Sequence, residues 1–258
     1  MKIAISGKGG VGKTTIMALL AHHLKKSFSQ VLIIDADPSP HMAETLGLDH
    51  PERITAIADM KELLRERSGQ TEGSPFYNIN PDIDDLPERF MQEKDGIKLM
   101  VLGAIQSGNK GCACAENTVL KRLLTKLLLK GNQAVLLDME AGVEHLGRGT
   151  IAGVDHLLVV VTPSQSSVRT ALKIHKLAQD VRIPKVSFVG NAVGTAEDQA
   201  FIESLLAHPV VASFPDAPEI RGAERRGIPV TALAETFSAP LQKIVDAVSV
   251  QGRSTAPR

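Results

Sequence analysis

The sequence has few residues that could stabilise a fold other than by aliphatic packing. Its 258 residues include two cysteines, one tyrosine, seven phenylalanines and no tryptophan. Two cysteines exclude a fold built on a disulfide framework, and the scarcity of aromatic side chains leaves the core to aliphatic ones. An aliphatic core suits a parallel β-sheet covered by helices.

The sequence also lacks an excess of charge and a long apolar run. Lys and Arg total 29 and Asp and Glu total 29, so no overall field would attract nucleic acid or an anionic membrane. No apolar stretch approaches the roughly 20 residues that a membrane-spanning helix needs. We therefore expect a cytoplasmic protein that binds neither nucleic acid nor membrane.

Short buried-type strands alternate with helical periods along the chain, which predicts an α/β fold with a mainly parallel sheet flanked by helices on both faces. Ligands of such a fold bind beyond the carboxyl ends of the strands. We expect one domain over residues 1–250, a polar insertion around 51–95 that contains a helix from Ile54 to Arg67, and a disordered tail at 251–258. The expected strands are Lys2–Ser6, Gln30–Asp35, Ile97–Leu102, Ala134–Asp138, His156–Thr162, Lys185–Asn191 and Val210–Phe214.

The first expected strand leads into a phosphate-binding loop, because Gly7–Thr14 matches the pattern Gly-x-x-x-x-Gly-Lys-Ser/Thr between a strand and a helix. Lys13 should reach the β and γ phosphates of ATP or ADP, and Thr14 should ligate Mg²⁺. A plain glycine turn would not require Lys and Thr at these positions. The expected nucleotide-binding residues of the loop are Gly9, Gly10, Val11, Gly12, Lys13, Thr14 and Thr15.

Acidic residues end two further strands at the same edge of the sheet. Asp35 ends one strand and Asp37 follows it. Asp138 ends a hydrophobic run that is typical of a Walker B carboxylate holding a magnesium-bound water. Asp37 is our candidate for the residue that positions the attacking water. The alternative, a plain loop carboxylate, predicts unchanged turnover after substitution.

The cysteines form a Cys-x-Cys pair, Cys112 and Cys114, just before an amphipathic helix expected to begin near Glu116. Two thiolates can bind one nickel or zinc ion, but such a site needs about four ligands, so a two-fold homodimer would have to supply the others. The alternative is that both cysteines are small half-buried hydrophobic residues.

Together these motifs resemble the deviant Walker A class of ATPases, which includes MinD, ParA and the nitrogenase iron protein. The class is marked by a second lysine in the phosphate loop, here Lys8, which by resemblance reaches the partner subunit's nucleotide during catalysis. The resemblance also implies that Asp37 orients water in switch I and that Gly142 in switch II senses the γ phosphate.

The cysteine pair and the extended switch II, Glu140–Gly149, narrow the resemblance to the CooC-type nickel-insertion ATPases, which mature carbon monoxide dehydrogenase and acetyl-CoA synthase. The resemblance implies an ATP-hydrolysing, Mg²⁺-dependent homodimer with nickel or zinc at its interface and one of these metalloenzymes as client. It also places Asn191, Pro215 and Asp216 beside the adenine, although Asn191 could be an ordinary turn residue. The alternatives are a MinD- or ParA-like switch on membrane or DNA and, third, an electron-transfer protein like the nitrogenase iron protein.

Overall fold

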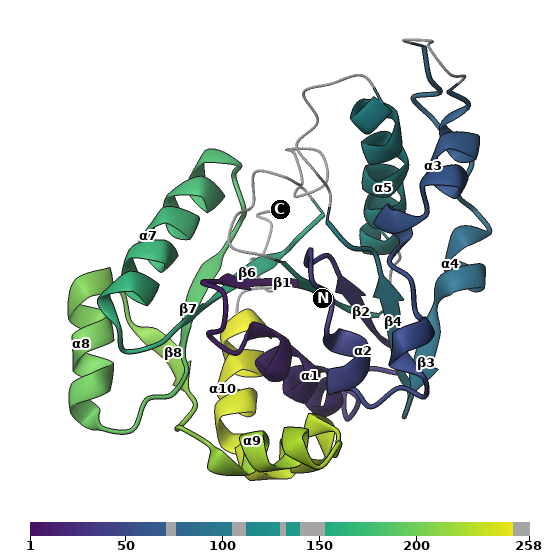
Figure 1. The fold of residues 1–258 in the computed structure, drawn as a ribbon. Coiled ribbons are helices and arrows are strands. Elements are labelled where there is room, and N and C mark those ends of the chain that lie inside the picture. The colour runs from purple at the N-terminus through teal and green to yellow at the C-terminus, as the bar shows by residue number, and fades with distance from the viewer. Residues whose placement is uncertain (71–75, 105–111, 130–132, 140–152, 250–258) are drawn as a thin grey trace, which may run out of the picture.

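The computed structural model describes residues 1–70, 76–104, 112–129, 133–139 and 153–249, with side chains omitted at 112–114 and 129. These residues form one eight-stranded sheet in the order β3-β4-β2-β5-β1-β6-β7-β8 (Figure 1). Every neighbouring pair is parallel except β3 and β4, which are antiparallel. The strands are β1 (Lys2–Gly7), β2 (Val31–Asp35), β3 (Gln92–Lys94), β4 (Ile97–Val101), β5 (Ala134–Asp138), β6 (His156–Val161), β7 (Val186–Gly190) and β8 (Val210–Ser213).

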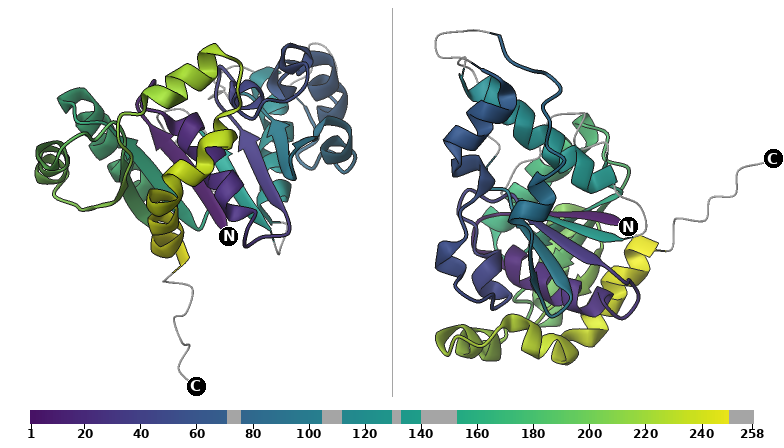
Figure 2. Two further views of the ribbon diagram at one scale, coloured as in Figure 1. Left: turned by 90° about the horizontal axis from the view of Figure 1, so that it is seen from below. Right: turned by 90° about the vertical axis from the view of Figure 1, so that its right-hand side faces the viewer.

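Helices cover both faces of the sheet (Figures 1 and 2). Apolar residues of α3, α5, α7 and α8 form one core cluster with the sheet, and those of α1, α2 and α10 form the other. Among the described residues, no helix is both long and apolar enough to cross a membrane. The helices are α1 (Lys13–Leu24), α2 (Met42–Thr45), α3 (Lys61–Ser68), α4 (Leu86–Phe90), α5 (Cys112–Leu129), α7 (Gln165–Asp180), α8 (Ala196–Leu206), α9 (Pro218–Arg225) and α10 (Ser238–Ser249), with 3₁₀ turns η1 (Pro51–Arg53), η2 (Ile57–Asp59) and η4 (Val230–Phe237).

The predicted fold class is confirmed, and the predicted strands differ from the observed ones by at most one residue at either end. Their side chains alternate between the two cores, as in β1, where Ile3 and Ile5 face one cluster and Ala4 the other. Because both faces are covered, nearly every strand position in the centre of the sheet is buried, which is why these strands appear as continuous apolar runs.

The predicted helix from Ile54 to Arg67 was wrong over its first half. Residues 57–59 form the 3₁₀ turn η2, and α3 begins only at Lys61. The backbone N–H of Ala58 donates to the carbonyl of Leu102 at 2.9 Å, which ties this turn to the end of β4. A long-range hydrogen bond therefore overrides the local helical preference.

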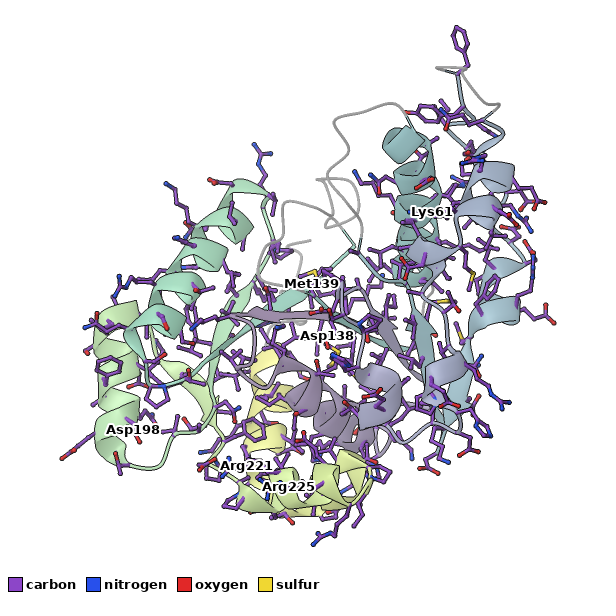
Figure 3. The ribbon with its side chains drawn as sticks, in the orientation of Figure 1. Lys61, Asp138, Met139, Asp198, Arg221 and Arg225 are labelled. Carbon is purple, nitrogen blue, oxygen red and sulfur yellow. The ribbon has the colours of Figure 1, made fainter. Side chains whose placement is uncertain are left out.

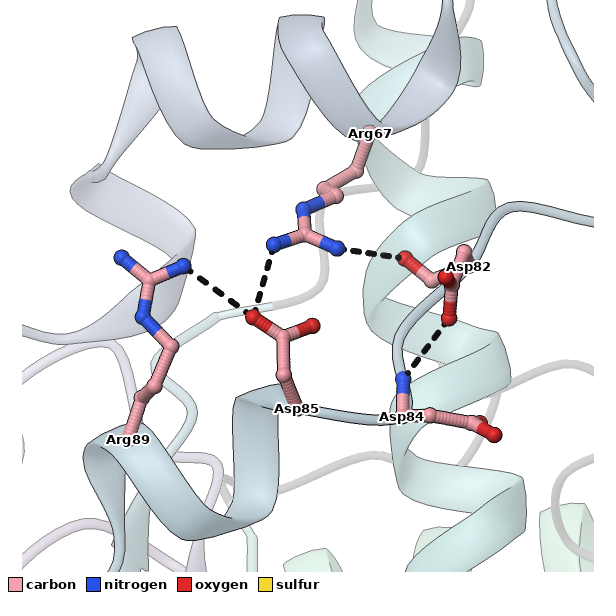
Figure 4. Close-up of polar contacts among 5 residues, drawn as sticks. All are labelled: Arg67, Asp82, Asp84, Asp85 and Arg89. Atoms are coloured by element: carbon pink, nitrogen blue, oxygen red, sulfur yellow. Dashed lines mark hydrogen bonds and ion pairs between the residues drawn. The ribbon is translucent and has the colours of Figure 1, made fainter.

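The polar segment 51–95, of which the structure describes 51–70 and 76–95, contributes to the main core. Leu64, Ile83 and Leu86 are buried in the cluster that contains α5. Three of its charged side chains pair within the segment: Asp85 accepts hydrogen bonds from Arg67 at 2.7 Å and from Arg89 at 3.1 Å (Figure 4). The tail at 251–258 lies outside the described residues.

Candidate nucleotide-binding site

The phosphate loop joins β1 to α1 at the carboxyl edge of the sheet. Gly12 has φ +90°, and a Cβ at this position would lie 2.4 Å from Nδ2 of Asn191, so only glycine fits. Gly12, the N-cap residue of α1, has no side chain to cap the helix, which leaves the first backbone N–H groups available to an anion. Lys13, at the start of α1, is only 7% exposed. The lysine side chain and the backbone N–H groups at the N-terminus of α1 together favour the binding of phosphate.

Thr14 and Asp138 form the candidate magnesium site. The Thr14 hydroxyl donates to Oδ2 of Asp138 at 2.8 Å, and Oδ1 of Asp138 is buried with no hydrogen-bond partner among the described residues. Burial, followed by repulsion from the Asp35 carboxylate, raises the pKa of Asp138 to about 7. The Thr14 hydroxyl and the Asp138 carboxylate, one oxygen of which has no partner among the described residues, fit a hard cation such as Mg²⁺. Such a cation would stabilise the charged form of Asp138.

Asp35 holds the loop that carries Asp37. Its Oδ1 accepts from the Asp37 N–H at 3.2 Å and its Oδ2 from the Met42 N–H at 3.1 Å, so one carboxylate closes the segment from the end of β2 to the start of α2. Burial raises the pKa of Asp35 to about 6. Asp37 itself is half-buried and accepts from the Ser39 N–H at 2.9 Å. The sequence analysis missed this role of Asp35, although a side chain bonded to the backbone two residues on is a common turn pattern for Asp.

Two cavities adjoin the phosphate loop and share Gly12 and Thr15. The larger, about 750 Å³, brings Asp37 together with the loop. The smaller, about 110 Å³, is lined by Asn191, Pro215 and Asp216, the residues predicted to flank adenine. Asp216 is paired with Arg221 of α9 at 2.7 Å, and Arg221 is labelled in Figure 3. The larger cavity is lined by Gly9, Gly10, Gly12, Lys13, Thr14, Thr15, Asp37, Ser39, His41, Glu44, Thr45, Glu224, Gly227, Ile228 and Val230.

Asn191 contacts the phosphate loop directly. Its Nδ2 donates to the carbonyl of Val11 at 2.8 Å across 180 residues of sequence. This bond uses one amide hydrogen and does not involve Oδ1, which is an acceptor suited to an amine such as that of adenine. Asn191 therefore links the end of β7 to the phosphate loop, a role that the sequence analysis did not anticipate.

Replacing Asn191 by alanine should weaken ADP and pyrophosphate to a similar degree, because the bond to Val11 supports the loop that binds phosphate. The loss of one such bond is worth about 1 kcal/mol, or roughly fivefold in affinity. Titration calorimetry with both ligands measures this, with Asn80→Ala, a surface variant, as control. Weaker ADP binding with unchanged pyrophosphate binding would instead assign Asn191 to the base alone.

The side chain of Lys8 is bonded to α7 of its own chain. Its Nζ donates to Oγ of Ser166 at 3.0 Å in the first turn of α7, and both side chains are exposed. Ser164 caps the same helix by accepting from the Ser167 N–H. Ser166 carries no motif, and its contact with a residue 158 positions away could not be found from the sequence.

Two predicted features fall partly or wholly outside the described structure. Gly142 belongs to residues that are not described. Cys112 and Cys114 lie in the first turn of α5, which corrects the expected helix start near Glu116. Their side chains are not described, and within the described residues no cluster of three or more metal-binding side chains occurs.

The comparison with protein families decides the class of this site. Residues 2–230 match the family described as the CobQ/CobB/MinD/ParA nucleotide binding domain. The chain belongs to this family. The phosphate loop, Asp37 and Asp138 all lie within the matched range, so the site belongs to a nucleotide-binding domain.

Relatives within the CobQ/CobB/MinD/ParA family confirm the resemblance that the motifs indicated. The carbon monoxide dehydrogenase accessory protein CooC of Rhodospirillum rubrum is 40% identical over 88% of each chain. An uncharacterized ATP-binding protein of Methanocaldococcus jannaschii is 37% identical, covering 89% of this chain and 91% of the relative. The septum site-determining protein MinD of Synechocystis is 28% identical over 92% of this chain and 84% of the relative.

Solved structures confirm the P-loop fold. A ParA family ATPase from Chlorobium tepidum has a TM-score of 0.68 at 19% identity and covers 96% of this chain and 97% of its own. MinD of Pyrococcus horikoshii, complexed with Mg-ADP, has a TM-score of 0.66 at 20% identity and covers 99% of both chains.

Proposed function

We propose that this protein is a cytosolic ATPase that couples ATP-driven dimerisation and hydrolysis to nickel insertion into carbon monoxide dehydrogenase or acetyl-CoA synthase. The observation that carries the proposal is the Cys112–Cys114 pair in a chain 40% identical to the carbon monoxide dehydrogenase accessory protein CooC.

The ATPase part rests on the geometry of the phosphate loop. The loop and the N-terminus of α1 bind the phosphates, while Thr14 and Asp138 hold Mg²⁺, which neutralises phosphate charge when bound. Asp37 orients the attacking water from the larger cavity. Lys8, exposed on the loop, reaches the nucleotide of the partner subunit, where its charge stabilises the transferring phosphoryl group.

The metal part rests on the position of the cysteines. Because β4 is parallel to β2, its carboxyl end lies at the edge of the sheet that carries the phosphate loop, and α5 is the next element in the chain. A dimer formed over this edge can bring two cysteine pairs together. Residues two apart in a regular helix do not face each other, so binding one ion through both thiolates requires the first turn of α5 to open.

Coupling requires that nickel or client bind the ATP-closed and open dimers with different affinity, since a ligand indifferent to the two states does no work. The same requirement holds for zinc, which would bind the same thiolates. This requirement makes nucleotide-dependent metal affinity the property to measure.

The test is anaerobic titration with nickel and with zinc, with and without ATP, combined with a mass measurement. Wild type should bind about one ion per dimer more than a variant that lacks the two thiols. The double variant Cys112→Ala, Cys114→Ala should lose that ion and keep nucleotide binding. Ala113→Ser, a change in the same turn, is the matched control. Full metal binding by the double variant would overturn the shared thiolate site.

The MinD relative supports a second candidate, a switch that organises a partner on a surface. Nucleotide-driven dimers without stoichiometric metal would favour it, and co-sedimentation with liposomes or DNA in the presence of ATP would then separate its two forms.

A further inference from the structure

Two histidines from different elements meet on the surface at the β8 end of the sheet. His175 lies on α7, and His208 lies between α8 and β8. Their ring centres are 4.8 Å apart and their planes are at 88°. Phe188 of β7 contacts both rings, at 5.5 Å from His175 and 5.6 Å from His208. Because the buried ring of Phe188 packs against both imidazoles, it holds His175 and His208 next to each other.

The spacing of the two rings matches that of two imidazoles on one metal ion. A metal–nitrogen bond of about 2.0–2.1 Å puts each ring centre about 3.2 Å from the ion. At angles near tetrahedral or square-planar, the ring centres are then about 5 Å apart. The observed separation of 4.8 Å falls in this range, so two imidazoles at these positions can share one ion when each turns a nitrogen towards it.

The chemical state of His175 also suits a ligand. Burial, and then the neighbouring His208, lowers the pKa of His175, which favours the neutral imidazole that binds metals. Gln179, one turn further along α7, places its Nε2 at 3.5 Å from Nε2 of His175. Rotation of this amide brings a carbonyl oxygen to the same place as a further ligand.

We propose that His175 and His208 bind one borderline divalent cation, such as Zn²⁺ or Ni²⁺, in a surface site separate from the cysteine pair. Water completes its coordination, since His208 is exposed. The site lies beside α7 and α8 and the β8 edge, whereas α5 lies near β4 towards the other edge (Figure 1). An open site with two protein nitrogens exchanges its ion readily, in contrast to a closed thiolate site.

The experiment uses the full chain carrying Cys112→Ala and Cys114→Ala, so that its result does not depend on the cysteine proposal. Zinc is titrated by calorimetry, and the imidazole nitrogens are followed by NMR. We expect saturable binding of about one ion per chain, with shifts at two histidines. Adding either His175→Gln or His208→Gln should abolish that binding phase.

His50→Gln is the matched control, because His50 is an exposed histidine whose ring is bonded to Glu52. It should leave the zinc isotherm unchanged. Thermal melts without metal should show that His208→Gln folds as its parent does. The proposal is overturned if the cysteine-free protein binds no stoichiometric zinc, or if its isotherm is the same with and without the two histidines.

Discussion

Replacing Asp37 by alanine should reduce ATP turnover by about 10²- to 10⁴-fold while ATP still binds, because orienting and activating the attacking water is worth about that much. Asp37 lines the cavity that contains Lys13 and Thr14, and its carboxylate is half-buried. We expect ATP binding to depend mainly on the phosphate loop, so it should persist without the Asp37 carboxylate. The measurement is single-turnover hydrolysis beside equilibrium binding of ATP.

Glu44→Gln provides a control for Asp37, since Glu44 lines the same cavity at the start of α2. It should retain turnover within a few-fold of wild type. Unchanged single-turnover hydrolysis in Asp37→Ala would identify Asp37 as a plain loop carboxylate.

Replacing Lys8 by glutamine should reduce turnover by about 10³- to 10⁵-fold, the range known for a cation supplied in trans to a transferring phosphoryl group. In the single chain Lys8 contacts Ser166, so its charge is not committed to its own phosphate loop. Affinity of the isolated chain for ADP should change little. Lys26→Gln, which removes an exposed lysine paired with Glu235 beyond the other end of α1, is the control.

Mixing the two inactive variants tests whether Lys8 acts across the dimer. In a mixed dimer, the subunit with Lys8→Gln retains Asp37 and receives Lys8 from its Asp37→Ala partner, which restores one complete site. Random pairing at equal concentrations should recover about a quarter of wild-type activity. If Lys8 served its own subunit, no site would be complete, and the mixture would stay inactive.

The sheet could be predicted closely because its central strands are buried on both faces and therefore appear as unbroken apolar runs. The edge strand β3, Gln92–Lys94, was missed because its residues are polar and it pairs on one side only. The early start given to α3 failed for a different reason: the bond between Ala58 and Leu102 joins positions whose proximity no local pattern encodes.

In the candidate site, too, features set by local sequence could be predicted, and those set by long-range contacts could not. The phosphate loop could be located because local spacing alone specifies a glycine-rich turn before a helix. The bonds from Asn191 to Val11 and from Lys8 to Ser166 depend on strand order, since β6 pairs with β1 and β7 pairs with β6, which brings the carboxyl ends of both strands near the loop. Sequence reasoning supplied residue types for the site, whereas the contacts between them required the topology.

The Asp35 carboxylate connects the loop that carries Asp37 to the start of α2. One oxygen holds the Asp37 N–H and the other holds the Met42 N–H, so the two ends of this loop share a single anchor. A displacement of the Asp37 backbone would therefore act on the same carboxylate that accepts a hydrogen bond from Met42, the first residue of α2. Asp35 therefore couples the position of the Asp37 backbone to that of the first residue of α2.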